Sequence, residues 1–234
     1  MSSIIGNPTR RALPRVLLGA LAAIAAAACG DVPTDDTNFP PQGAMRGSVL
    51  YDGPLPCTLA TVDSLGQRQT HVLGQAVLLV FNQDLLPPPE GFGTTAAQLG
   101  VVAGDEVFAG IADQLPKPEG PAGSIMCPPP GTHVTVSAPW SIGPVPVGRW
   151  QVRAFYDYDG DFSPILKIHQ LPTAGDIGGG AVANPEEVLK GKPVKFQTIE
   201  IGVDRDGDGK LEPPKTGVLV DNISVSLAQT LTFP

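Results

Sequence analysis

The chain has 234 residues, of which 23 are acidic and 15 are basic, so its net charge is −8. Its 28 glycines and 26 prolines exclude a long coiled coil or a helix bundle, because both residues break helices. The acidic balance argues against nucleic-acid binding, which needs a basic surface, and a single short apolar run is too little for a multi-span membrane protein.

The N-terminus, residues 1–28, is predicted to be an export signal. Three arginines precede thirteen mostly apolar residues, 16–28, which are too few to span a bilayer but suit a signal peptide. Ala26-Ala27-Ala28-Cys29 resembles a bacterial lipobox, with Ala26 where that motif usually has leucine. The resemblance implies cleavage before Cys29, lipid on that cysteine and a membrane anchor. An ordinary secretory signal and a twin-arginine signal are the alternatives.

Residues 29–42 are predicted to be a flexible tether, because they are polar, contain prolines and lack periodicity. In the lipoprotein sorting scheme an aspartate after the cysteine favours the inner membrane, so Gly30 favours the outer membrane. Loss of the signal removes three arginines and no acidic residue, so the net charge of −8 becomes −11. Such a chain attracts cations and avoids nucleic acid.

Residues 43–234 are predicted to form one all-β domain, an antiparallel β-sandwich with little helix. Short apolar or alternating segments are separated by glycine and proline turns. The continuous apolar run 76–81 is typical of a strand covered on both faces, and 149–156 alternates, with Val152, Ala154 and Tyr156 on one face. The predicted strands are 46–51, 76–81, 133–137, 149–156, 195–203 and 223–227.

Helix is predicted at only two places, 94–99 and 185–190, the second starting with Asn184 as cap and Pro185 in the first turn. Residues 83–131 are rich in proline and glycine. They form either a long insertion or an extra edge of the sandwich. The glycine run 175–180 lacks the spacing of a dinucleotide-binding motif and is interpreted as a flexible loop.

Cys57 and Cys127 are predicted to form a disulfide, because Cys29 is used by the lipid and the exported compartment is oxidising. In the chain-entropy model the closed loop stabilises the fold by roughly 4 kcal/mol. Two free buried thiols or a metal pair are the alternatives. A metal pair would lack histidines at a spacing that suits a metal site.

Three segments carry a resemblance to a known family. They are Gly47-x-Val49-x-Tyr51-x-Gly53-Pro54, then 74–80, then Pro146-Val147-Gly148-Arg149-Trp150-Gln151-Val152-Arg153-Ala154. Together they resemble the carboxypeptidase-regulatory, transthyretin-like β-sandwich family, with Trp150 where that family usually has tyrosine or phenylalanine. The resemblance covers about half of the mature chain. It implies a Greek-key sandwich that serves as a stalk, accessory module or binding domain, and it does not select among these roles.

The strongest local motif is the sequence D-x-D-x-D-G that starts at Asp204. Alternating acids place several carboxylates inside one tight turn, and hard oxygen ligands suit Ca²⁺. Lys215 replaces the bidentate glutamate of an EF-hand, and Asp221 is available to substitute for it. The alternative is a solvated acidic turn. The candidate calcium ligands here are Asp204, Asp206, Asp208, Lys210 through its carbonyl, and Glu212.

A second acidic loop, with Asp157, Asp159 and Asp161, directly follows the best alternating strand. Carboxylates this close repel one another unless a cation or water screens them. Calcium ligation is therefore a hypothesis for this loop as well, with Asp176 as a possible further ligand. The two loops share one site if both lie at the same end of the sandwich.

Enzymatic motifs are missing from the sequence: it has no G-x-S-x-G and no H-E-x-x-H. His71, His133 and His169 show no paired spacing and are interpreted as polar strand or loop residues. Trp140 and Trp150 are interpreted as core anchors, with a carbohydrate or partner surface as the alternative.

These observations predict a lipid-anchored, non-enzymatic binding or structural module of the cell envelope, tethered to the membrane by its lipid. Its partners are expected to be an envelope protein or polysaccharide, and not nucleic acid. A hydrolase acting on polysaccharide, or its accessory subunit, is the rival hypothesis and requires two carboxyl groups in one cleft, one with a raised pKa. The third hypothesis is that the protein is a subunit of a larger envelope assembly.

Overall fold

The computed structural model describes residues 42–87, 90–91, 96–163, 172–188, 190, 192–213 and 217–232. The predicted signal at 1–28, Cys29 and the tether up to residue 41 lie outside these residues. Strands dominate, so the predicted all-β class is confirmed. Among the described residues, no helix has both the length and the apolar character needed to cross a membrane.

The elements are short and alternate with turns. The strands are β1 (Gly43–Pro54), β2 (Thr58–Val62), β3 (Arg68–Val72), β4 (Gln75–Asn82), β5 (Gln98–Ala103), β6 (Ile125–Met126), β7 (His133–Val145), β8 (Gly148–Asp157), β9 (Ile177–Gly180), β10 (Ile199–Ile201) and β11 (Leu219–Thr230). The helical turns are η1 (Gln83–Leu85), α2 (Gly104–Val107), η2 (Ala109–Ile111) and α3 (Pro185–Val188).

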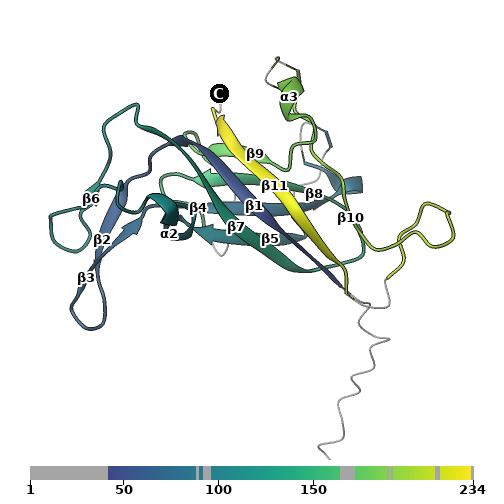
Figure 1. Cartoon of the computed structure of the whole chain (residues 1–234), viewed down its shortest axis with the longest axis horizontal. Helices are drawn as coiled ribbons and strands as arrows, with labels where there is room; N and C mark the ends of the chain where they lie inside the picture. Colours follow the sequence, from purple (N-terminus) through teal and green to yellow (C-terminus); the bar gives the residue numbers. More distant parts are fainter. Residues whose placement is uncertain are drawn as a thin grey trace, which may run out of the picture. The chain divides into compact units, whose positions relative to one another are not determined.

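One large sheet forms both layers of the domain. Its strand order is β5-β4-β8-β9-β11-β1-β7, and β10 also pairs with β8. In Figure 1, β1, β7 and β11 run diagonally across β4, β5 and β8. The end strands β5 and β7 contact each other without pairing, so the sheet folds back on itself. The result is a sandwich-like arrangement with the core between the two halves.

Three aromatic rings lie at the centre of this core. Tyr51, Phe108 and Tyr156 are fully buried and meet edge to face, with ring centroids 5.1–5.6 Å apart. The hydroxyl of Tyr51 donates to the carbonyl of Pro54, and that of Tyr156 to the carbonyl of Leu73. Burial raises the pKa of both tyrosines, so both stay neutral hydrogen-bond donors.

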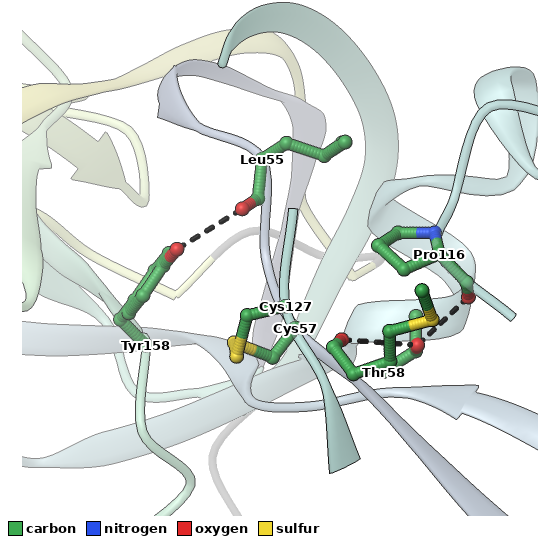
Figure 2. Close-up of a disulfide and its surroundings, with 7 residues drawn as sticks. Leu55, Cys57, Thr58, Pro116, Cys127 and Tyr158 are labelled. Atoms are coloured by element: carbon green, nitrogen blue, oxygen red, sulfur yellow. Dashed lines mark hydrogen bonds between the residues drawn. A yellow bond between two sulfur atoms is a disulfide. The ribbon is translucent and has the colours of Figure 1, made fainter. Parts of the chain in front are cut away.

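A three-stranded sheet of order β3-β2-β6 packs beside the large one, at the left of Figure 1. The predicted disulfide between Cys57 and Cys127 is confirmed, and it joins the start of β2 to the end of β6. Figure 2 shows the bond near Thr58, whose buried hydroxyl donates to the carbonyl of Pro116. The bond therefore ties the segment around 116–127 to the N-terminal strands.

The predicted strands are present, and burial follows the predicted pattern in β4 and β11, whereas β8 is buried on both faces, including Gln151 and Phe155. Ile223, Val225 and Leu227 of β11 point inward, and β4 is buried on both faces as the run 76–81 indicates. Only residues 199–201 of the predicted strand 195–203 form a strand. Trp140 and Trp150 are each 5 % exposed, so they are core residues and not a stacking surface for sugars.

The sheet is not wholly antiparallel, which corrects the prediction. β1 and β11 pair in parallel, and β1 lies between β11 and β7. A short connection can join only antiparallel neighbours, but these two strands are separated by most of the domain. Their direction is therefore free of any turn constraint.

Two local predictions fail because tertiary packing overrides the local pattern. The described part of the predicted helix at 94–99 contributes Gln98 and Leu99 to β5, which pairs with β4 and extends the sheet edge. The predicted helix at 185–190 is present as α3. The glycines at 178–180 are not a flexible loop but form β9, which pairs with both β8 and β11.

The glycines of β9 are needed because neighbouring backbones approach too closely for a side chain. A Cβ atom on Gly179 would lie 1.7 Å from the carbonyl oxygen of Ser226, on β11. A Cβ on Gly180 would lie 2.6 Å from the carbonyl oxygen of Val152, on β8. Gly110, in η2, has no atom within 4 Å of its Cβ position.

We predict that Gly179→Ala lowers the free energy of unfolding by about 3 kcal/mol or more, because the methyl group forces strands apart. The matched variant Gly110→Ala is expected to be neutral or to stabilise by about 0.5 kcal/mol. Urea unfolding of both variants measures the difference. Equal stabilities would show that β9 is not packed as described.

Candidate metal sites

The D-x-D-x-D-G motif forms a hairpin directly after β10 (Figure 1). Val203 and Glu212 close it as a β-bridge, each N–H donating to the other carbonyl. Gly207 and Gly209 have φ of 76° and 84°, the left-handed region that glycine adopts without cost. The glycine spacing of the motif therefore produces a tight loop flanked by strand-like segments and not by helices.

The hairpin gathers all four predicted ligand side chains. One carboxylate oxygen from each of Asp204, Asp206, Asp208 and Glu212 lies within 4.8 Å of the others. Backbone N–H groups hold them: Asp204 accepts from Gly207 at 2.8 Å and from Gly209 at 3.1 Å. The local sequence thus builds an oxygen-rich cluster with hard donors of the kind that Ca²⁺ prefers.

The carbonyl of Lys210 stays a predicted ligand, and the proposed substitute Asp221 lies elsewhere. The ammonium of Lys210 lies 3.4 Å from Asp208, and its exposed charge provides little compensation for four acids. Asp221 pairs with Arg46 at 2.6 Å and does not join the cluster. Lys215 lies outside the described residues.

The second cluster is buried and joins two strands. Asp157 ends β8, and Asp176 immediately precedes β9. Because Tyr156 pairs with Ile177, Asp157 and Asp176 lie opposite each other just past the end of the ladder. Asp157 is fully buried, Asp176 is 2 % exposed, and their oxygens lie within 4.8 Å of one from Asp159.

Backbone N–H groups surround the two buried carboxylates. Asp157 accepts from Gly160 at 2.9 Å and from Asp161 at 3.1 Å. Asp176 accepts from Tyr158 at 2.9 Å and from Thr173 at 2.8 Å. Asp161 thus contributes its backbone N–H, but its carboxylate is not part of the cluster. Of the three ligands predicted for this loop, Asp157 and Asp159 are in the cluster and Asp161 is not.

The two buried acids, Asp157 and Asp176, lie close together, and both have raised pKa values. Burial raises the pKa of Asp157 to about 6, and the nearby charge of Asp176 adds to the shift. Burial also raises the pKa of Asp176. None of the ion pairs found among the described residues involves either group. The pair therefore favours a bound proton or a bound cation.

The two clusters are separate sites, so the idea of one shared site is wrong. Asp157 is the last residue of β8, whereas the hairpin follows β10, whose Ile201 pairs with Gly148, the first residue of β8. The strand has 10 residues. At about 3.3 Å per residue its ends are roughly 30 Å apart.

The two described histidines, His71 and His133, do not join either cluster. His71 contacts Asp105 at 2.6 Å, and His133 lies 3.7 Å from Asp52, both at exposed positions. The carboxylate of Asp105 also accepts the N–H of Val72, so this acid connects α2 to β3. His169 and Cys29 lie outside the described residues.

No family model, curated protein or solved structure matches the chain.

We predict that the contribution of Asp157 to the stability of the metal-free protein is lost as pH rises from about 4 to about 6. A group whose pKa is higher in the folded than in the unfolded state stabilises the fold while it is protonated. That stabilisation is lost as pH rises through the folded pKa. For Asp157 that value is about 6, against 3.8 for an ordinary aspartate. Urea unfolding in the presence of a chelator measures the slope.

Asp157→Asn should flatten that slope, because the amide does not titrate. The exposed Asp113, mutated to asparagine, is the matched control and should leave the slope unchanged. A slope that is equally steep in Asp157→Asn would contradict the assignment.

Proposed function

We propose that the protein is a lipid-anchored binding or structural module of a bacterial cell envelope, with loops stabilised by calcium. The observation that carries the proposal is the hairpin cluster, in which Asp204, Asp206, Asp208 and Glu212 bring oxygens within 4.8 Å of one another. Four acids on one exposed turn repel each other at neutral pH. A divalent cation removes that repulsion and fixes the loop.

The role of the ion in this proposal is structural. Binding to the folded loop and not to the unfolded chain stabilises the fold by mass action, by about 2.7 kcal/mol when free calcium is a hundredfold above its dissociation constant. The buried pair Asp157 and Asp176, with Asp159, is the second proposed site. A cation there replaces the proton that the raised pKa values favour.

The proposed module has a transthyretin-like β-sandwich fold. The three segments that resemble the transthyretin-like family form β1, β4 and β8, and β8 pairs directly with β4. The two-layered, sandwich-like sheet is compatible with such a module. Family members of this kind act mostly as stalks or binding domains, which supports a non-catalytic role.

The proposal assigns no catalytic activity to the acidic pairs. A general acid must reach its substrate. Asp157 and Asp176 have raised pKa values, but both are buried and their oxygens accept backbone N–H groups. Asp221 is exposed, and its pairing with Arg46 lowers its pKa, which is opposite to the shift that a general acid needs.

We predict that calcium raises the thermal midpoint of the full chain and that Asp206→Asn largely removes the part due to the hairpin. The asparagine keeps an oxygen that can accept the N–H of Asp208, as Asp206 does at 3.2 Å, but loses the charge that binds the ion. Calorimetry of the protein in detergent, with calcium and then with EGTA, measures the shift.

Asp113→Asn is the matched control, since it removes one exposed charge away from both clusters.

Asp157→Asn tests the second site separately from the first. Because the sites are distinct, the effects of Asp206→Asn and Asp157→Asn on the thermal midpoint should add. No calcium-dependent shift in the wild-type chain at millimolar concentrations would refute the calcium part of the proposal.

We predict that Cys29→Ser releases the protein from the membrane fraction of expressing bacterial cells. Several acyl chains on one residue anchor stably, and serine offers no thiol to carry them. Fractionation followed by immunoblotting measures the distribution, with Cys57→Ser plus Cys127→Ser as the cysteine control. A serine variant that stays in the outer membrane would contradict lipid anchoring.

A further inference from the structure

An open groove of about 800 Å³ lies over β1, β7 and β11 and reaches β5 and α2. Neither acidic cluster lines it. Its polar lining includes Arg46, Ser48, Glu106, Ser141 and Asn222, and apolar walls come from Val101 and Pro139. A hollow of this size with a few convergent polar groups suits a small molecule or one segment of a polymer.

The floor of the groove is built by an irregularity in the parallel β1–β11 pair. Met45 pairs with Val220 and Gly47 with Ile223, so two residues of β11, Asp221 and Asn222, oppose the single residue Arg46. This is a β-bulge, a feature that re-aims side chains and recurs beside functional sites. Both extra residues are exposed, whereas regular alternation would point one of them inward.

The bulge holds a backbone conformation that non-glycine residues seldom adopt. Asn222 has φ of 62°, and it is the sole non-glycine residue with positive φ among the described residues. Asparagine tolerates this region better than most residues, but it is still less favourable than the ordinary regions. An outlier of this kind inside a strand is a reason to look for a function at that point.

The bulge completes a polar row across three strands. Ser141 of β7 lies opposite Arg46, and Asp221 and Asn222 lie on the other side of it. Neighbouring strands are about 4.8 Å apart, so the row offers polar groups at that interval. Asp221 is fixed by the guanidinium of Arg46 at 2.6 Å and by the N–H of Asn222 at 2.7 Å.

Electrostatics select the class of ligand. Arg46 and Asp221 neutralise each other, which leaves the carboxylate of Glu106 as the unbalanced charge among the lining residues. An anionic ligand is therefore disfavoured. The guanidinium has five N–H donors and the serine and asparagine side chains both donate and accept, which matches hydroxyl groups that also do both.

An extended peptide is a poorer match than a sugar chain. Strand addition needs continuous backbone pairing along an edge. β7 is the edge strand here and carries Pro139, which has no N–H, within the groove. The available groups are side chains on the face of the sheet, and they suit a ligand that carries its polar groups as substituents around an apolar ring.

We propose that this groove binds a neutral glycan chain, with Arg46, Asn222 and Ser141 donating to its hydroxyl groups. The inference deepens the binding-module part of the proposed function and is independent of its calcium part. The groove is the face of the domain that contacts envelope polysaccharide, and it lies apart from both acidic clusters.

The test titrates two neutral hexasaccharides, maltohexaose and N-acetylchitohexaose, into the isotope-labelled full chain in detergent with EGTA present. Amide spectra are followed up to about 10 mM sugar, tenfold above a millimolar dissociation constant. At least one sugar should shift the amides of Ser48, Ser141 and Asn222 in a saturable way. EGTA makes the result independent of calcium, so failure of one proposal does not imply failure of the other.

Two variants assign the binding to the bulge. Asn222→Gly keeps the positive φ without strain but removes the side-chain carboxamide, and Arg46→Gln removes the guanidinium. Each substitution should weaken sugar binding about fivefold or more. Arg149→Gln is the matched control, because Arg149 forms a similarly exposed pair with Glu200 away from the groove and should leave the affinity unchanged.

Three outcomes would overturn the proposal. One is the absence of amide shifts at the groove with both sugars. Another is saturable binding whose shifts map elsewhere or that Arg46→Gln and Asn222→Gly leave intact. The third is a groove that stays unperturbed by sugar but is saturated by a capped hexapeptide of serine and threonine, which would make the site a peptide-binding one.

Discussion

The close approach of three backbones at β9 is the constraint on which the architecture depends. In the strand order, β9 stands where the sheet passes from β4 and β8 to β11 and β1. A Cβ on Gly179 would meet the carbonyl oxygen of Ser226 at 1.7 Å, so a strand of larger residues cannot occupy this corner. Glycine in a strand often marks a tight bend of this kind. Without it the two halves of the sheet could not fold over one core.

The same corner explains why two acids are buried together. Asp157 and Asp176 sit at the ends of the strands that β9 brings into register, one pairing step beyond Tyr156 and Ile177. Like charges directly opposite each other destabilise a sheet. The backbone N–H groups of the adjoining loops offset part of that cost. The acidic pair is therefore a product of the fold's geometry as well as of local composition.

Sequence patterns predicted those parts of the fold that depend on local periodicity. The alternation in β11 and the apolar run in β4 predicted the right strands and the right buried faces, whereas the alternation in β8 predicted the strand but not its burial on both faces. The pattern failed at β9, because glycines carry no hydrophobic signal and their pairing is visible only in three dimensions. It also failed at β5, where pairing with β4 outweighs local helix preference.

The candidate sites also differ in whether they depend on local sequence or on long-range strand pairing. The hairpin cluster was predictable because its ligands are contiguous, and D-x-D-x-D-G dictates the turn that gathers them. The buried pair was only partly predictable, since Asp176 is joined to Asp157 by strand register. The groove gave no sequence signal at all. Its row of Ser141, Arg46 and Asn222 comes from three strands, and the bulge depends on the register between two distant ones.

The parallel pairing of β1 with β11 has a consequence for biogenesis. Among the described strands, β1 leaves the ribosome first and β11 leaves it last. Since β1 lies between β7 and β11, half of its backbone hydrogen bonds wait for the final residues of the chain. A chain synthesised from its N-terminus thus keeps β1 unpaired on one side until β11 is available. The β1–β11 pairing joins residues far apart in sequence, so the topology itself delays closure of the sandwich until β11 has been synthesised.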